Sequence, residues 1–290
     1  MNFDLVSPTT TEDLLRAIDE HRGRRFRFGA GYTDLLLDLE EQQDNELTVI
    51  NLARLNDPSF TSIVHDGGEM RIGALVTASR IIADRKLQSR YPVLCQAAGQ
   101  HGSRQIRHTA TVGGNLCTAS PAGDMACALV ALRARCDILP ARGDARSLAV
   151  SDFFLGVRET DLKEDEVLRR VIIPTDDGEV KTHSDFIKIG KRRSMECAVV
   201  SIAYHIESDG DDTMTRAGIA IGSVAPTIKY ARSACEYLVG KRLSSLGPSE
   251  RDEFAAKVVE YASPISDIRA SAWYREDVLF NMSKSILENH

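Results

Sequence analysis

One stretch of the chain, residues 109–124, constrains the fold more than any other, and we call it the second glycine motif. Two adjacent glycines stand among hydroxyl side chains and lead to a Ser-Pro turn and one acid, in the sequence Thr109-Ala-Thr-Val-Gly-Gly-Asn-Leu-Cys-Thr-Ala-Ser-Pro-Ala-Gly-Asp124. Because Gly113 and Gly114 reach positive φ and carry no Cβ, consecutive backbone N–H groups can converge there on an anion. We therefore predict a loop that wraps a phosphate, with further hydroxyl donors at Thr109, Thr111, Thr118 and Ser120.

The acid that ends this motif directly precedes the apolar run 125–132, which is typical of a helix. Asp124 is therefore expected either to cap that helix or to accept a hydrogen bond from a ribose hydroxyl. A glycine turn followed by a capped helix is the alternative interpretation of the whole stretch, because short glycine patterns often occur without a ligand.

A second candidate phosphate site, the first glycine motif, spans residues 29–35 near the N-terminus. Residues 25–28 alternate polar and apolar side chains as a strand does, Gly29-Ala-Gly-Tyr-Thr-Asp34 interrupts them, and a helix is predicted from Leu35. A strand, a glycine turn and a helix N-terminus present free N–H groups to an anion. The third glycine of a Rossmann motif is missing. An ordinary strand-to-helix turn is the alternative.

Composition bounds the class of protein. The 290 residues, 43% of them hydrophobic, can bury a large core and are long enough for two domains. The net charge of -6 argues against a nucleic-acid partner, since such partners require Lys and Arg to neutralise phosphates. No apolar run reaches the roughly 20 residues of a membrane span, and the N-terminus lacks a secretory pattern, so we expect a cytoplasmic protein with no membrane span.

The cysteines predict neither a metal site nor an iron–sulfur cluster in this chain, because no two stand at ligand spacing. We expect buried or half-buried free thiols at Cys95, Cys117, Cys127, Cys136, Cys197 and Cys235. No catalytic acid–base pair, nucleophile elbow or Walker loop is recognisable, so hydrolysis and phosphoryl transfer have no support.

The remaining pattern predicts two domains. Helices are expected over 9–22, 78–86 and 91–102, and strands over 47–52, 70–77 and 166–174. Residues 175–180 are polar and turn-rich, so we place the domain boundary there, with one domain at 1–178 and the other at 179–290. The second domain should contain a hairpin of strands 197–207 and 214–222, followed by helices over 231–239, 248–263 and 271–288.

Residues 103–124 resemble the second FAD-binding motif of the flavoprotein (medium) subunits of molybdenum hydroxylases, the xanthine dehydrogenase and carbon monoxide dehydrogenase family. The similarity runs over nearly the whole chain, including the family's Asp-Phe-Phe-x-Gly-x-Arg-x-Thr stretch at 152–160. The first glycine motif is similar to the family's Ala-Gly-Gly-Thr-Asp-Leu pattern, with Tyr32 in place of the second glycine. Tyrosine at positive φ is strained by about 1 kcal/mol, so either the loop is reshaped or the ring covers part of the cofactor.

The resemblance implies an α+β architecture. A two-subdomain FAD-binding domain of the vanillyl-alcohol oxidase (PCMH) type, split near residue 56, would precede a smaller domain of antiparallel sheet and helices. The FAD-binding residues that the resemblance and the motifs indicate are Ala30, Gly31, Tyr32, Thr33, Asp34, Leu35, Thr111, Gly113, Gly114, Asn115, Thr118, Ser120 and Asp124.

The densest basic run of the chain adds one candidate. It comprises Lys188, Lys191, Arg192 and Arg193, and by charge alone it indicates a solvated face. Lys188 alternates with apolar neighbours on a predicted strand, so it can point inward, and the resemblance implies that it lies near the flavin. A cation there would stabilise an anionic reduced flavin.

The resemblance also implies a function. The chain would be the electron-transfer subunit of a dimer of heterotrimers, with molybdopterin in a large partner subunit and [2Fe-2S] clusters in a small one. Its FAD would pass electrons to NAD or another acceptor. Two alternatives stay open: a stand-alone flavin-dependent reductase with the same fold, and a non-catalytic scaffold that has lost FAD.

Overall fold

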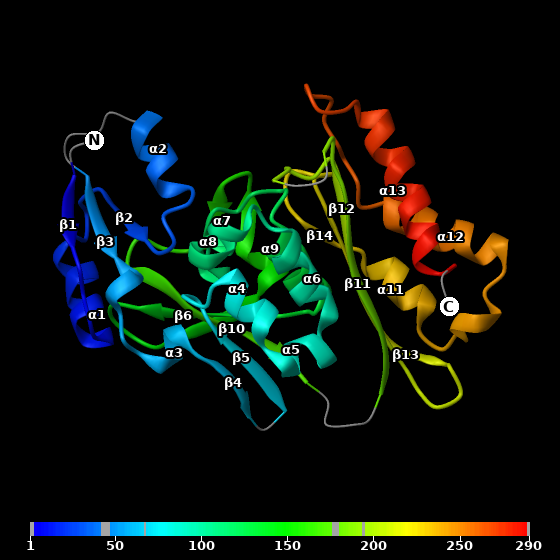
Figure 1. Cartoon of the computed structure of the whole chain (residues 1–290), viewed down its shortest axis with the longest axis horizontal. Coiled ribbons are helices and arrows are strands. Elements are labelled where there is room, and N and C mark those ends of the chain that lie inside the picture. The colour runs from blue at the N-terminus through cyan, green and yellow to red at the C-terminus, as the bar shows by residue number, and fades with distance from the viewer. Residues whose placement is uncertain (1–2, 42–46, 67, 176–179, 193–194, 289–290) are drawn as a thin grey trace.

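The computed structural model describes residues 3–41, 47–66, 68–175, 180–192 and 195–288. Within them, three main sheets follow one another along the long axis of the molecule, in chain order from left to right in Figure 1. Arg193 and residues 176–179 of the predicted domain boundary lie outside the described residues. In the described part of the chain, no helix is both long enough and apolar enough to span a bilayer.

The N-terminal sheet is small and parallel, with strand order β1-β3-β2. Its elements are β1 (Asp4–Val6), α1 (Thr11–Glu20), β2 (Phe26–Gly29), α2 (Leu35–Glu41) and β3 (Thr48–Asn51). Helix α1 begins after Thr10, whose hydroxyl accepts a hydrogen bond from the Asp13 N–H, and it buries Leu14 and Ile18 against the sheet. The strand, turn and helix predicted around the first glycine motif are confirmed.

The central sheet is antiparallel, with strand order β4-β5-β10-β6-β7. Its strands are β4 (Ile63–Asp66), β5 (Glu69–Gly73), β6 (Arg135–Pro140), β7 (Arg146–Ala149) and β10 (Glu166–Pro174). The shorter elements η1 (Leu52–Arg54) and α3 (Pro58–Thr61) lead into this sheet from the N-terminal one, and α10 (Val150–Phe153) with the small hairpin β8 (Phe154–Gly156) and β9 (Glu159–Thr160) connects β7 to β10.

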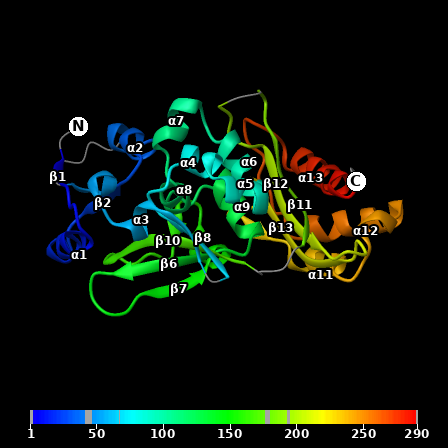
Figure 2. The same cartoon turned by 60° about the horizontal axis from the view of Figure 1, so that its bottom comes forward.

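Helices cover one face of the central sheet (Figure 2). They are α4 (Ala78–Ala83), α5 (Arg85–Arg90), α6 (Pro92–Gln100), α7 (Arg104–Thr109), α8 (Val112–Cys117) and α9 (Asp124–Ala131). The single helix predicted over 78–86 is wrong, because Asp84 interrupts it. The Asp84 carboxylate accepts hydrogen bonds from the N–H groups of Lys86 and Leu87 and so starts a new helix.

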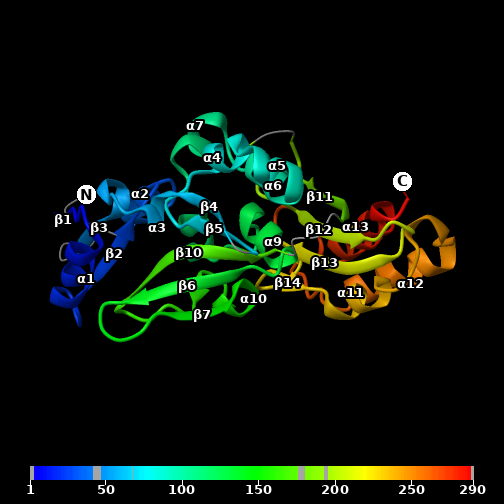
Figure 3. The same cartoon turned by 90° about the horizontal axis from the view of Figure 1, so that it is seen from below.

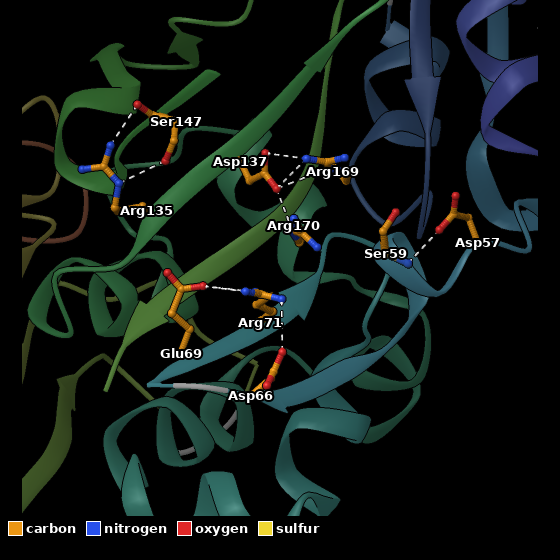
Figure 4. Close-up of polar contacts among 10 residues, drawn as sticks. All are labelled: Asp57, Ser59, Asp66, Glu69, Arg71, Arg135, Asp137, Ser147, Arg169 and Arg170. Atoms are coloured by element: carbon orange, nitrogen blue, oxygen red, sulfur yellow. Dashed lines mark hydrogen bonds and ion pairs between the residues drawn. The ribbon is translucent and has the colours of Figure 1, made fainter. Parts of the chain in front are cut away.

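The opposite face of this sheet carries charged side chains (Figure 4). Asp137 on β6 receives hydrogen bonds from Arg169 and Arg170, which are adjacent on β10. Neighbouring residues on a strand normally point to opposite faces, but the register of β10 shifts between Leu168 and Arg170, so both guanidinium groups reach one carboxylate. The core that the sheet forms with these helices therefore lies on the helical side, whereas Val167 on β10 packs into a separate cluster with Leu14 of α1 and Ile50 of β3.

The C-terminal sheet is antiparallel, with strand order β11-β12-β13-β14. Its strands are β11 (Lys181–Ile189), β12 (Val200–Ser208), β13 (Met214–Gly222) and β14 (Lys229–Tyr230), and they precede α11 (Arg232–Leu238), η2 (Leu243–Ser245), α12 (Pro248–Val259) and α13 (Ala272–Ile286). Helices α11 to α13 lie on one side of this sheet, and α6 and α9 lie on the other (Figure 3).

Strand β12 is buried on both faces. Ile202 and Tyr204 belong to the core that the sheet forms with α11 to α13, whereas Ala203 belongs to the core around α9. The sheet is therefore a wall shared by two hydrophobic cores. The predicted α+β architecture, with a smaller antiparallel sheet and helices at the C-terminal end, is confirmed.

The cysteines depart in part from expectation. Cys127, Cys136 and Cys235 are buried and Cys95 is half-buried, but Cys117 and Cys197 are exposed, so the prediction of buried or half-buried thiols is wrong for these two.

Candidate functional site

The two glycine motifs touch each other through backbone atoms. A Cβ placed on Gly31 would lie 2.2 Å from the carbonyl oxygen of Thr109, at the start of the second motif. Only glycine permits so close an approach. The loop before α2 consequently lies beside α8, as Figure 1 shows, and the structure brings together two segments that are about 80 positions apart in the chain.

The first glycine motif leaves its backbone donors free. Within the described residues, the N–H groups of residues 30–34 donate no hydrogen bond. The hydroxyl of Thr33 donates to Asp34 Oδ2 at 3.3 Å, and α2 begins at the next residue. A run of unused N–H groups that leads into a helix N-terminus is suited to an anionic ligand.

Tyr32, which replaces a glycine of the family pattern, adopts a positive φ of 61°. Its ring folds back over Gly29, where an added Cβ would lie 2.4 Å from Tyr32 Cζ, and packs against the cluster of Leu35, Leu39, Leu47 and Val49. Burial raises the pKa of the Tyr32 hydroxyl. The backbone strain is thus offset by packing against the protein itself.

The second glycine motif differs from its prediction. Gly113 and Gly114 do not adopt positive φ but lie in the first turn of α8, which Thr111 caps. The Val112 N–H donates to Val76 O, the Gly113 N–H to Ala74 O, and the Gly114 N–H to Thr111 Oγ1. The predicted phosphate loop is therefore a capped helix, because carbonyl and hydroxyl groups of the protein occupy these donors.

Glycine is required at position 113 for packing. A Cβ there would lie 2.7 Å from both the Cβ and the carbonyl oxygen of Ala74, so the missing side chain lets α8 press against the segment after β5. At Gly114 an added Cβ would meet Thr111 Oγ1 alone, at 3.0 Å. A side chain at position 113 would therefore disturb the packing of α8 against Ala74 more than a side chain at position 114 would disturb the Thr111 cap.

Other polar residues of the second motif also serve its internal structure. Asn115 Oδ1 accepts a hydrogen bond from the Ala126 N–H and so joins α8 to α9, while Ser120 Oγ accepts one from the Ala122 N–H. Thr118 is the C-cap of α8, and Ala119 after it has φ at 46°. The motif is a rigid connection between two helices.

The motif ends at a buried ion pair between the two domains. Asp124 Oδ2 accepts a hydrogen bond from Lys188 Nζ at 2.7 Å, and the two side chains are only 4% and 9% exposed. Gly123 is the N-cap of α9, so Asp124 is not a cap, and its Oδ1 is buried without a partner among the described residues. Lys188 points inward as its strand position predicts, whereas Lys191 and Arg192 are exposed.

Burial dominates the electrostatics of this pair. It raises the pKa of Asp124 to about 6 even though Lys188 acts to lower it. His101 Nδ1 lies 3.9 Å from Asp124 Oδ2, and burial lowers the pKa of this imidazole, with the charge of Lys188 acting in the same direction. An unused carboxylate oxygen in such a place requires a donor to satisfy it.

A cavity of about 440 Å³ adjoins the first motif, because its wall includes the residues of β2 that precede Gly29. It combines four cationic side chains with two phenylalanines whose ring centroids are 5.4 Å apart. This cavity was not predicted from the sequence, although the alternation Arg-Phe-Arg-Phe from residue 25 places two arginines and two phenylalanines on one strand. The lining residues are Arg24, Arg25, Phe26, Arg27, Phe28, Leu47, Leu162, Lys163, Glu164 and Glu166.

Comparison with known proteins decides the family. Residues 1–176 match the model of the FAD binding domain in molybdopterin dehydrogenase. The chain belongs to this family. Residues 185–289 of this flavoprotein match a second model, that of the CO dehydrogenase flavoprotein C-terminal domain. The resemblance found in the sequence is thereby confirmed, and the chain is a flavoprotein of the oxidoreductase class with FAD as its cofactor.

Individual relatives are similar over most of their length. The flavoprotein is 30% identical to the nicotinate dehydrogenase FAD-subunit of Eubacterium barkeri over 84% of this chain and 81% of that protein. It is 29% identical to the glyceraldehyde dehydrogenase medium chain of Sulfolobus acidocaldarius over 96% of this chain and 94% of that protein. Carbon monoxide dehydrogenase of Hydrogenophaga pseudoflava has the same fold, with a TM-score of 0.90, 24% identity, and coverage of 99% of this chain and 96% of that chain.

Proposed function

We propose that this flavoprotein is the electron-transfer subunit of a molybdopterin-dependent hydroxylase. A small partner subunit would carry [2Fe-2S] clusters, a large one would bind molybdopterin and hydroxylate the substrate, and the complex would be a cytoplasmic dimer of heterotrimers. The bound FAD would supply the redox chemistry of this chain, accepting electrons from the clusters and delivering them to NAD or another acceptor.

One observation supports the proposal that this chain transfers electrons and holds no metal centre. Among the described residues, no group of His, Cys, Asp or Glu side chains is arranged to hold a metal ion. The relatives whose names are given above are a subunit and a medium chain, that is, parts of larger assemblies. We infer that the metal centres belong to partner chains.

The free donors of the first glycine motif support a place for the FAD pyrophosphate. A pyrophosphate carries negative charge and many acceptor oxygens, which the unused N–H groups of residues 30–34 can satisfy. The assigned residues there are Ala30, Gly31, Tyr32, Thr33, Asp34 and Leu35. Gly31 has a second task in this proposal, since it holds the loop against Thr109.

The unpartnered Oδ1 of Asp124 supports a place for a polar part of FAD between the domains. Because that oxygen is buried and makes no hydrogen bond within the described residues, a hydroxyl or ring N–H of the cofactor would satisfy it. Lys188 would then lie near the flavin, with its charge balanced by the Asp124 carboxylate. Thr111, Gly113, Gly114, Asn115, Thr118 and Ser120 would shape this wall of the site.

The cavity beside β2 supports a place for the adenosine end. Apolar rings at Phe26 and Phe28 suit an adenine base, and the arginines and the carboxylates Glu164 and Glu166 in the same wall suit the polar edge of the base and the ribose hydroxyls. The proposal thus assigns the cavity to the adenosine, the first glycine motif to the pyrophosphate and the surroundings of the Asp124–Lys188 pair to the flavin.

Flavin extraction and reduction of the purified chain test the proposal. We expect one FAD per chain, bleached by dithionite or NADH, and no bleaching by a purine or aromatic heterocycle until molybdenum and iron–sulfur subunits are added. Turnover by the chain alone would instead identify a stand-alone reductase. A purified chain without flavin that fails to bind added FAD would identify a scaffold.

A further inference from the structure

His101 lies at the end of α6, a helix that packs beside both α9 and β11 (Figure 1). It is the C-cap of this helix, and its backbone N–H donates to the carbonyl of Ala98. The carbonyls of His101 and Gly102 both accept hydrogen bonds from Arg107 Nη1. These contacts fix the turn between α6 and α7, so the imidazole is held at the junction of the two domains.

The imidazole faces the buried ion pair. His101 Nδ1 lies 3.9 Å from Asp124 Oδ2, the same oxygen that accepts the hydrogen bond from Lys188 Nζ. Lys188 Nζ also donates to the carbonyl of Gln100, the residue before His101, at 3.4 Å. We call His101, Asp124 and Lys188 the interdomain cluster. The side chain of His101 is 22% exposed and the other two are almost fully buried, so His101 is the member that exchanges protons with solvent most readily.

Charges of both signs surround the His101 ring. Burial lowers its pKa most, and the charges of Lys188 on β11 and Arg107 on α7 act in the same direction. Asp34, at the end of the first glycine motif, opposes them, and Asp124 faces the ring from α9. Because the pKa lies below the ordinary 6.5, the ring is mainly neutral at pH 7. An added negative charge nearby would favour its protonated form.

The free oxygen of Asp124 connects the interdomain cluster to the cofactor. Asp124 Oδ1 is buried without a partner among the described residues, and a hydroxyl or ring N–H of FAD is proposed to satisfy it. His101 faces the other oxygen of the same carboxylate. A flavin that contacts Oδ1 would therefore lie close to His101, in a largely buried place where water and salt screen charge weakly.

Reduction of the flavin changes the charge of this place. Two electrons and one proton convert FAD to its anionic reduced form, which carries one additional negative charge. Lys188 can stabilise that charge only in part, because its own charge is already balanced by the Asp124 carboxylate. With a neutral His101, the cluster and the reduced flavin together carry one uncompensated negative charge. One proton on the imidazole compensates it.

We infer that His101 binds one proton when the flavin is reduced and releases it when the flavin is reoxidised, an inference that rests on the proposed function. Two electrons and two protons are then taken up together, of which one proton goes to the flavin and one passes from solvent to the His101 ring. Proton binding and electron binding favour each other by linkage. The midpoint potential of the flavin therefore falls more steeply with rising pH than uptake of a single proton predicts.

The test is a spectroelectrochemical titration of the purified full-length chain with its bound FAD, between about pH 6 and 8. The slope of the flavin midpoint potential against pH gives the number of protons taken up per electron pair. Around pH 7 we expect about two for the wild type and about one for His101→Gln, whose amide takes up no proton. His65→Gln is the matched control and should keep the wild-type slope. His65 is 21% exposed and lies 3.5 Å from Asp84, but it belongs to β4 at the edge of the central sheet.

Every other outcome overturns the inference. Uptake of one proton per electron pair by the wild type across this range does so without any variant. A wild-type slope in His101→Gln assigns the second proton to the flavin itself or to Asp124, and an equal loss of slope in His65→Gln shows that the effect is not specific to His101. These three results leave the proposed function standing, because FAD is bound and reduced in each. A chain that binds no FAD overturns the proposed function as well.

Discussion

The two glycine motifs look alike in sequence and do opposite things with their backbone donors. In the first motif, residues 30–34 leave their N–H groups unused within the described part of the chain. In the second motif, the N–H groups of Val112, Gly113 and Gly114 donate to Val76, Ala74 and Thr111. Adjacent glycines can therefore mark close packing of a helix as well as contact with an anion, and the fate of the N–H groups distinguishes the two.

The largest effect is expected for Gly31→Val, which attacks the contact between the two motifs. A Cβ only 2.2 Å from Thr109 O forces the first motif away, so its donors lose their position. We expect FAD affinity to fall about 100-fold or more, because overpacking against backbone costs roughly 1–3 kcal/mol and the displaced donors add to this. Flavin titration measures it. Gly99→Val, where no atom lies within 4 Å, is the control, and wild-type affinity in Gly31→Val would refute the role of this contact.

The next largest effect is expected for Lys188→Met at the end of the second motif. Removing one partner of a buried ion pair costs roughly 3 kcal/mol or more, provided that Asp124 is ionised. The pKa of Asp124, about 6 against an ordinary 3.8, is raised on folding, so the native state binds the proton more tightly and stability falls as pH rises between these values. Without Lys188 this fall should be larger and should extend to higher pH.

Urea unfolding at pH 5 and pH 8 measures this difference. We expect Lys188→Met to be much more destabilising at pH 8 than at pH 5, where Asp124 is protonated in the variant. Lys191→Met, at an exposed lysine, is the control and should show little pH dependence. An equal loss at both pH values would contradict the assignment to Asp124.

A smaller effect is expected for Gly113→Ala, which tests whether the second motif is a packing element. Its Cβ would meet Ala74 at 2.7 Å, so unfolding should be easier by roughly 1–3 kcal/mol, while FAD affinity of the folded protein should change only a few-fold. Gly114→Ala, with one contact at 3.0 Å, should cost less. Thermal unfolding and flavin titration separate these quantities. Loss of FAD without loss of stability would show that this motif binds the anion directly.

The smallest effect is expected for Tyr32→Gly in the first motif. Glycine removes about 1 kcal/mol of strain at positive φ but also removes a ring packed over Gly29. The two terms oppose each other, so the free energy of unfolding should change by less than about 1 kcal/mol. FAD content should stay at the wild-type level, as judged by absorbance. A flavin-free variant would mean that the tyrosine ring itself supports the cofactor.

The sequence predicted the architecture well because periodicity and turn residues act locally. The strand at 166–174, the hairpin around Gly210 and the inward direction of Lys188 follow from such patterns. The hydrogen-bond partners of the Val112 and Gly113 N–H groups could not be predicted in this way, because Val76 and Ala74 lie more than 35 positions earlier in the chain. The pairing of Asp124 with Lys188 and the cavity beside β2 likewise depend on segments that meet only in the folded chain.

The shared sheet has a consequence for how the protein could be divided. Since β12 contributes side chains to both hydrophobic cores, each domain expressed alone would expose a large apolar face that its neighbour normally covers. Each domain alone should therefore aggregate in solution, yet the two domains should associate when they are mixed. The junction between the matched domain sequences is thus a sensible place for split-protein complementation and a poor one for truncation.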